Sequence, residues 1–252
     1  MGWKAAAAMA VIAGASGCAS VPATDGSADV ASSPWVATPG AAWEHRAFPG
    51  KKSTQFHYER KDGRDTVAAR SEASASMLRR QTRVEPQDLG HVRFSWLVPE
   101  LIPGADMARR DAEDAPVRIV LAFDGDRTRL SPRDAMLSEL ARTLTGEEMP
   151  YATLMYVWCN DRQPGTVIHN PRTDRIRKLV VESGANRLNH WLEYERDVRA
   201  DYERVFGEKP GALIGVAIMT DSDNTQSHAR AWYGPVSLVG APAANTLSAS
   251  AR

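Results

Sequence analysis

Residues 43–240 hold many short runs of apolar or alternating residues with turn-forming residues between them, and this pattern limits the fold more than any other feature. His91–Val98 has apolar residues at every second position, which is typical of a strand with one buried face. Val117–Phe123 is apolar almost throughout, as in a strand covered on both faces. Asp62-Gly63 is a hairpin turn signal. Further strands are expected at residues 54–58, 66–70, 151–159, 175–182, 191–198, 212–219 and 229–239. Many strands separated by turns predict a mostly β fold, a β-sandwich.

One or two short helices are expected as insertions between these strands. Ser131–Leu144 begins with a serine that can cap a helix and has Pro132 at the first helical position. Its apolar residues are spaced to form one stripe, namely Met136, Leu137, Leu140 and Leu144. A second helix is expected at Val198–Phe206, directly before Gly207.

The first residues have the layout of a secretory signal peptide. Lys4 precedes an apolar segment that ends near Ala15 and is too short to span a bilayer as a permanent helix. Ala15-Ser16-Gly17-Cys18 resembles the bacterial lipobox, in which the peptide is cut before the cysteine and the thiol carries a diacylglycerol. The alternative is an ordinary signal peptide that is cut nearby, with Cys18 incidental.

If Cys18 is lipidated, its acyl chains hold the chain on a membrane, because two or more chains give stable anchoring. Position 19 is alanine and not aspartate, which favours the outer membrane by analogy with lipoprotein sorting. We therefore expect an outer membrane lipoprotein that faces the periplasm. The other cysteine, Cys159, lies in a hydrophobic run and is expected to be a buried structural thiol.

The domain organisation follows from composition. Residues 1–17 are the expected signal peptide, and residues 18–42 are the lipidated cysteine with a tether rich in Ala, Ser, Pro and Gly. Residues 43–240 are expected to fold as a single β-sandwich domain, followed by a disordered tail at 241–252. The 31 basic and 31 acidic side chains give a net charge of zero, so the charge pattern does not indicate a nucleic-acid partner.

Several motifs spread over the chain resemble one bacterial family, catalogued as domain of unknown function 3047. These motifs are Phe48–Lys52, Ser71–Ser76, Arg109–Ala115, Val120–Gly125, Gly215–Thr225 and Ala231–Gly234. The resemblance covers Trp43 to Val239, and its most specific piece is the segment GVAIMTDSDNT. It implies a single envelope domain with a jelly-roll-like antiparallel β-sandwich, similar to sugar-binding modules. It implies no established activity, so it assigns no catalytic residues.

The polar loop that follows the apolar run at 212–219 concentrates the best ligand-like groups of the chain. Asp221, Asp223 and Thr225 are spaced like the oxygen ligands of calcium loops, and Asn224 lies among them. The loop is not an EF-hand, because Gln226 stands where that motif needs glycine. The alternative is a turn whose carboxylates accept backbone N–H bonds. The strands on both sides of the loop are expected to form a hairpin with this loop at its tip.

Other candidate ligand-binding residues lie elsewhere in the sequence. Arg109 and Arg110 could grip an anionic or polyhydroxyl ligand, or belong to a solvated loop with internal ion pairs. Asp124 precedes a glycine and is either a ligand-binding group or part of a turn. Trp232 and Tyr233 lie close to the polar loop in sequence, and Trp232 is the best candidate among the tryptophans for an exposed sugar-stacking ring. The alternative is a core position, because a sandwich needs large residues between its sheets.

Three functions are compatible with these features. The first is a non-catalytic, lipid-anchored module that binds an envelope glycan or another partner. The second is a glycoside hydrolase that uses Asp221 or Asp223 with another acid. The third is a structural domain whose loop is stabilised by calcium or by hydrogen bonds. The sequence contains no zinc-binding histidine pair, nucleophile elbow, P-loop or dinucleotide fingerprint.

Overall fold

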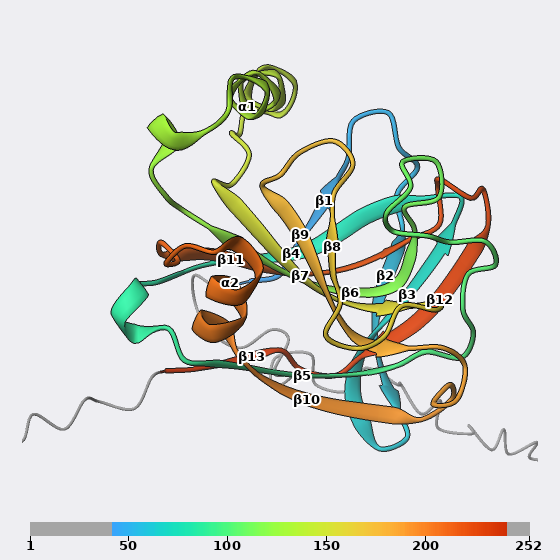
Figure 1. The fold of residues 1–252 in the computed structure, drawn as a ribbon. Helices are drawn as coiled ribbons and strands as arrows, with labels where there is room; N and C mark the ends of the chain where they lie inside the picture. Colours follow the sequence, from blue (N-terminus) through green and yellow to red (C-terminus); the bar gives the residue numbers. More distant parts are fainter. Residues whose placement is uncertain (1–41, 241–252) are drawn as a thin grey trace, which may run out of the picture. The chain divides into compact units, whose positions relative to one another are not determined.

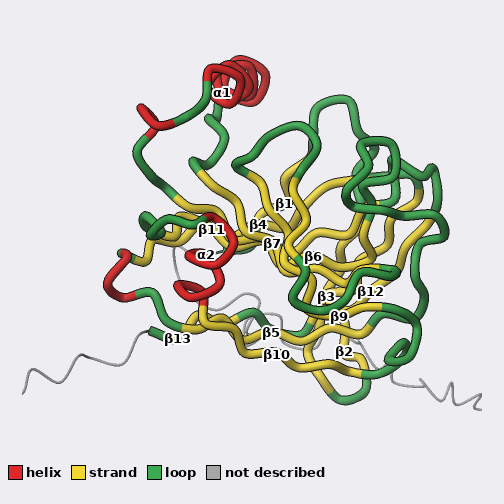
Figure 2. The backbone as a smooth tube through the Cα atoms, viewed as in Figure 1, coloured by secondary structure: helices red, strands yellow, loops and turns green. Residues whose placement is uncertain are grey.

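Two β-sheets lie face to face in residues 42–240, the part of the chain that the computed structural model describes (Figure 1). The larger sheet has the strand order β1 (Glu44–Ala47), β4 (Ala75–Val84), β11 (Leu213–Asp221), β6 (Ala115–Phe123), β7 (Ala152–Cys159), β9 (Ile176–Ser183) and β8 (Val167–His169). The smaller sheet has the order β10 (Trp191–Asp197), β5 (His91–Leu97), β12 (His228–Tyr233), β3 (Arg64–Glu72) and β2 (Gln55–Lys61), and β13 (Ser237–Val239) pairs with β5. Neighbouring strands are antiparallel except for β7 and β9. The predicted jelly-roll-like β-sandwich is confirmed, with a larger sheet that is visibly curled (Figure 2).

The main core fills the space between the two sheets. Phe94 and Trp96 on β5 meet Tyr156 on β7, with ring centroids of Phe94 and Tyr156 5.7 Å apart. Ile119 on β6 and Ile218 on β11 are fully buried in the same cluster. Because successive side chains of a strand point to opposite faces, this core uses only one face of the larger sheet.

A long loop covers part of the outer face of the larger sheet. Met107, which lies between β5 and β6, packs there with Val157, Ile168 and Val180 in a second apolar cluster. The covered part lies over β7, β8 and β9. The rest of the outer face, over β4, β11, β6 and the first half of β7, is the floor of the cleft described below.

Both predicted helices are present. Helix α1 (Pro132–Thr145) begins after Ser131, whose hydroxyl oxygen accepts a hydrogen bond from the Asp134 amide, and ends at Gly146 in the left-handed region. Helix α2 (Val198–Phe206) has the predicted bounds, and its Tyr202 belongs to the main core. Short 3-10 turns lie at η2 (Pro86–Asp88) and η3 (Arg127–Arg129).

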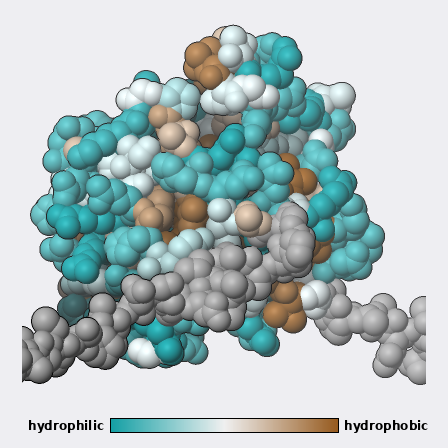
Figure 3. Space-filling view, turned by 180° about the vertical axis from the view of Figure 1, so that it is seen from behind, coloured by the Kyte–Doolittle hydropathy of each residue, from teal (hydrophilic) through white to brown (hydrophobic). Residues whose placement is uncertain are grey.

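The apolar stripe of α1 is largely exposed. Met136, Leu140 and Leu144 are 63%, 52% and 63% exposed, whereas a stripe on an ordinary surface helix packs against the core. The helix projects from the sheets at the top of Figure 1, and an apolar patch marks the same end of the molecule in Figure 3.

Most expected strands are present within a few residues, and the predicted hairpin at Asp62-Gly63 joins β2 to β3. Cys159 is buried, as expected. The predicted strand at 229–239 is divided into β12 and β13 at Gly234-Pro235, because proline cannot donate to a ladder. Three observed strands were not among the predicted ones: β1, β4 and β8.

The hairpin expected around the 221–225 loop is wrong. Strand β11 already pairs with β4 on one side and β6 on the other, so no edge is left for β12. The loop instead carries the chain from the larger sheet to the smaller one, where β12 pairs with β3 and β5.

Within residues 42–240, no helix has the length and apolar character needed to cross a membrane. The predicted signal peptide, the lipidated Cys18, most of the tether and the tail lie outside the described residues.

Candidate ligand-binding cleft

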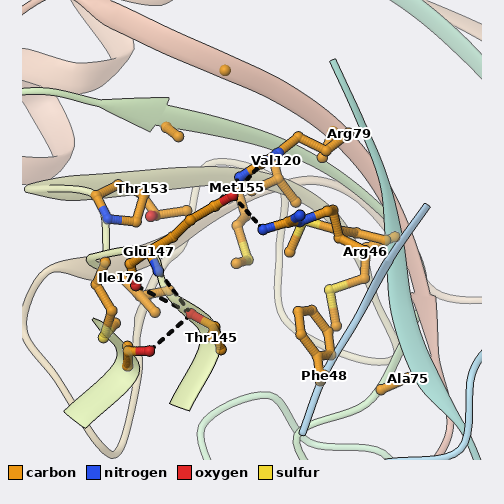
Figure 4. Close-up of a pocket in the computed structure, with 18 of the residues that line it drawn as sticks. Arg46, Phe48, Ala75, Arg79, Val120, Thr145, Glu147, Thr153, Met155 and Ile176 are labelled. Carbon is orange, nitrogen blue, oxygen red and sulfur yellow. Dashed lines mark hydrogen bonds and ion pairs between the residues drawn. The ribbon is translucent and has the colours of Figure 1, made fainter. Parts of the chain in front are cut away.

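The outer face of the larger sheet forms the floor of a cleft of about 1110 Å³ (Figure 4). Alternate residues of neighbouring strands line it because the strand register brings them to the same face. Arg79 on β4 is opposite Ala217 on β11, Ala217 is opposite Val120 on β6, and Val120 is opposite Met155 on β7. The next rows contribute Met77, Met219, Gln81, Gly215, Ala122, Thr153 and Ile176.

The floor is apolar and adaptable. Met77, Met155 and Met219 come from three different strands, and each is partly exposed to the cleft. Unbranched thioether side chains adjust their shape to a ligand more readily than branched ones do. Val120 and Ala217 between them are small, which leaves depth at the centre of the floor.

Two walls rise from this floor. Helix α1 supplies one wall through the side of its stripe that carries Leu137, Leu140 and Leu144. Strand β1 and the segment after it supply the other wall, with Arg46 and Phe48. The apolar stripe of α1, which does not pack against the core, therefore borders the cleft.

Glu147 joins the two walls across the cleft (Figure 4). It follows Gly146, the C-cap of α1, and its carboxylate accepts hydrogen bonds from Arg79 Nη1 and Nη2 at 2.7 and 3.2 Å. Arg46 on β1 forms an ion pair with the same carboxylate. Hydrogen bonds from Arg79, together with the charges of both arginines, lower the pKa of Glu147.

A buried network of charges closes one end of the cleft. Arg118 on β6 donates through Nε and Nη2 to the two carboxylate oxygens of Asp221 on β11, both at 2.8 Å. The side chains are only 2% and 4% exposed. Lys178 is fully buried and donates to Glu113 Oε1 at 2.7 Å and to the Met107 carbonyl at 3.0 Å.

Burial sets the protonation behaviour of this network. It raises the pKa of Asp221 to about 6, against the lowering effect of Arg118. The pKa of Lys178 falls to about 8 because of burial and the nearby charge of Arg118, although Glu113 opposes this shift. Burial lowers the pKa of Arg118, but hydrogen bonds to Asp221 and the negative charges of Asp221, Glu113 and Asp114 outweigh burial, so the pKa is raised.

The predicted polar loop lies beside this network. Asp114 accepts hydrogen bonds from the amides of Asn224 and Thr225 at 3.1 and 2.7 Å and from the Thr225 hydroxyl at 2.6 Å. Asp223 forms an ion pair with Lys51. Asp221, Asp223 and Asn224 line the end of the cleft.

The same region bears on the predicted calcium site of Asp221, Asp223 and Thr225. Carboxylate oxygens of Asp114, Asp221 and Asp223 lie within 4.8 Å of one another. Each of these carboxylates, however, already accepts hydrogen bonds from other protein groups or forms an ion pair with one. This pattern supports the hydrogen-bonded loop that the sequence left as the alternative, and calcium binding stays a prediction.

The other predicted site residues lie apart from the polar loop or from one another. Arg109 and Arg110 are exposed on the loop before β6, where Arg109 pairs with Asp111 at 2.7 Å. This is the solvated loop with internal ion pairs. Asp124 lies on the rim of the cleft, and its carboxylate accepts a hydrogen bond from the Gly125 amide at 2.9 Å.

Trp232 and Tyr233 do not join the polar loop at one site. Trp232 is only 6% exposed and packs with Ala68 and Leu97 on the smaller sheet, so it is buried and not exposed for stacking. Tyr233 is buried between the sheets, where its hydroxyl donates to the Met219 carbonyl at 2.6 Å. Both residues lie away from the polar loop because the hairpin that would place them beside it does not form.

Sequence reasoning missed the residues that give the cleft its character. Arg46, Met77, Arg79, Glu147 and Met155 lie on four separate segments, so no local motif joins them. The alternation of Ala75, Met77, Arg79 and Gln81 on β4 is the signal that could have revealed a polar-edged sheet face.

A mostly β sandwich with a ligand-sized cleft on the outer face of one sheet is the class that fold and site define. The chain belongs to the family described as Protein of unknown function (DUF3047), which matches residues 41–237. The resemblance found in the sequence is thereby confirmed.

Similar solved structures include the xyloglucanase domain of NopAA, a type three effector from Sinorhizobium fredii, in complex with cellobiose. The two chains have a TM-score of 0.43 and 9% sequence identity over 81% of this chain and 96% of that chain. A comparison with curated proteins gives no match.

Replacing Asp221 with asparagine should destabilise the protein by about 3–5 kcal/mol, because Arg118 would be left as a buried charge without its partner. Urea unfolding of Asp221→Asn measures this loss. Asp111→Asn is the matched control, because its pair with Arg109 is exposed and its loss should change stability little. Equal, small effects of both substitutions would contradict the assigned role of the buried pair.

Stability should also rise with pH through the titration of Lys178. Between about pH 8 and 10.5 the unfolded chain keeps a proton that the folded chain has lost, so the free energy of unfolding increases. From about pH 7.5 to about pH 9.5, the increase should be larger in the wild type than in Lys178→Met by about 2 kcal/mol. Urea unfolding at both pH values tests this, and identical pH dependence in the two proteins would show that Lys178 titrates normally.

Proposed function

We propose that this protein is a lipid-anchored module of the bacterial cell envelope that binds an apolar or amphipathic ligand in the cleft without catalysing a reaction. The observation that carries the proposal is the floor, in which methionines from three strands surround small aliphatic side chains. Ligand sites in proteins are concave and largely apolar with a few placed polar groups, and this cleft has that composition.

The size of the cleft supports the same conclusion. At about 1110 Å³ the cleft is slightly larger than the usual range for small-molecule sites, which is roughly 300–1,000 Å³, so it has room for a whole ligand of this class. The exposed stripe of α1 adds apolar surface beside the floor. A ligand that covers Leu140 and Leu144 would give this stripe the partner that the core does not provide.

The carboxylates around the cleft favour binding over hydrolysis. A glycoside hydrolase needs one protonated carboxyl as acid and a second carboxylate as base or nucleophile. Asp221 receives two hydrogen bonds from Arg118, Asp223 is paired with Lys51, and Glu147 is paired with two arginines. Each of the three carboxylates is thus already bound by basic side chains of the protein, which leaves none of them free for acid–base work.

An envelope glycan is the second candidate ligand. Polar side chains at the cleft support it, namely Gln81, Thr153, Asn170 and Asn224. The rings that line the cleft are those of Phe48 and Tyr151, whereas Trp232 lies on the other sheet. A glycan would thus rely on hydrogen bonds more than on stacking, and Trp232→Ala should leave its binding unchanged.

A neutral apolar fluorophore, N-phenyl-1-naphthylamine, tests the proposed site. The wild type should bind it, and Ala122→Trp should weaken binding at least about tenfold because a large ring would fill the floor. Ala108→Trp is the control, since Ala108 is exposed on the loop before β6. Fluorescence titration of folded variants gives the affinities. Equal binding by wild type and Ala122→Trp would place the probe elsewhere, and calorimetric binding of glycans alone would favour the second candidate.

The envelope assignment rests on Cys18 and is tested separately. Cys18→Ser should move the chain from the membrane fraction to the soluble periplasmic fraction, because the acyl chains provide the membrane affinity. Fractionation and mass spectrometry of the mature N-terminus measure this. An unmodified thiol at position 18 in the wild type would contradict lipid anchoring.

A further inference from the structure

Arg46 and Arg79 form a two-arginine site at the edge of the apolar floor, and a carboxylate already occupies it. The occupant is Glu147, whose two oxygens face both guanidinium groups (Figure 4). Planar guanidinium groups bind carboxylates through paired N–H donors, so this pair has the chemistry of a carboxylate receptor.

We propose that this pair binds the carboxylate head of a long-chain amphiphile, a fatty acid, and that Glu147 is an intramolecular competitor that such a ligand displaces. The inference rests on the proposed function, because the alkyl chain would occupy the cleft. It adds that the ligand is an anion and that the contact of Glu147 with the two arginines regulates the entry of the ligand.

The charge balance at the pair favours an anion from outside. Two guanidinium groups face one carboxylate, which leaves a local excess of one positive charge. The pair is also partly shielded, since Arg79 is 22% exposed and Arg46 is 35% exposed. An ion pair in such a setting is stronger than one in open solvent.

Arg79 also has a donor that Glu147 does not satisfy. Its Nε atom is buried and has no hydrogen-bond partner, one of three such side-chain atoms among the described residues. A buried donor without an acceptor destabilises the folded protein. Glu147 accepts hydrogen bonds from the two Nη atoms only. The carboxylate of a ligand is not fixed to the end of α1, so it could also reach the Nε side of the same guanidinium.

The apolar floor begins beside this pair. Ala217, Val120 and Met155 follow Arg79 in the same row across three neighbouring strands. Three strand spacings of about 4.8 Å give roughly 14 Å of floor, which a medium-length alkyl chain can span. Head and chain of one molecule would therefore meet the arginines and the methionine-lined floor together.

Displacement of Glu147 would loosen one end of α1 and leave the other end attached. At the N-terminal end, Asp134 accepts a hydrogen bond from Thr173 at 2.5 Å. Near the C-terminal end, Glu148 pairs with Arg127 at 3.1 Å, outside the two-arginine site. Glu148 is thus a neighbouring acid with a different partner, and it supplies a matched control.

Dodecanoate and the neutral alcohol dodecanol separate the head from the chain. Calorimetry of the full chain should show tighter binding of dodecanoate than of dodecanol. Glu147→Gln should strengthen dodecanoate binding about fivefold or more and leave dodecanol unchanged, because only the anion competes with Glu147. Arg79→Met should remove the preference for dodecanoate, and Glu148→Gln should change neither affinity.

The outcomes distinguish this inference from the proposed function. If Ala122→Trp blocks dodecanol but dodecanoate binds no better than the alcohol in wild type or Glu147→Gln, the head-group site is wrong and the apolar cleft stands. If neither amphiphile binds to any variant, both proposals fail. Equal strengthening of both ligands by Glu147→Gln would mean that Glu147 only blocks access, which also overturns the carboxylate site.

Discussion

The alternation of side chains along the strands of the larger sheet is the constraint on which the rest of the structure depends. Every strand of this sheet has two faces, and the sandwich core uses only one of them. Leu121 and Ile218 fill the core, whereas Val120 and Ala217 point to the opposite side. The strand register thereby fixes the backbone positions of a floor of ten or so residues without any loop having to shape it.

The two charged contacts at the cleft differ in how deeply they are buried and in how easily they break. The Arg118–Asp221 pair is sealed from solvent and joins adjacent strands, so it contributes to the definition of one end of the cleft and is costly to break. The Arg46–Glu147–Arg79 contact is partly exposed and joins the segment after α1 to the paired strands β1 and β4. The first is therefore a structural element, and the second is a contact that a ligand can replace.

The sequence was informative wherever the signal was local. Ser131 and Gly146 mark the ends of α1 and Asp62-Gly63 marks a hairpin, because caps and turns depend on a few adjacent residues. Strand partners depend on the whole sheet, and this is why the hairpin predicted around the 221–225 loop was wrong.

The character of the cleft could not be derived in the same way. Arg79 and Glu147 are 68 positions apart, and the methionines of the floor read as ordinary core residues when each strand is taken alone. Strand β4 was not predicted, because its arginines interrupt the alternation of apolar and polar residues that a strand with one apolar face normally has. Only the register of β4, β11, β6 and β7 joins these residues into one surface.

If the outer face of the larger sheet is a ligand site for an apolar chain, a crystal structure of the Cys18→Ser chain with dodecanoate will show the ligand there. We expect an alkyl chain over Val120 and Met155, with its carboxylate at Arg46 and Arg79 and Glu147 turned away. A ligand bound elsewhere on the molecule, with the methionine floor in contact with water alone, would contradict it.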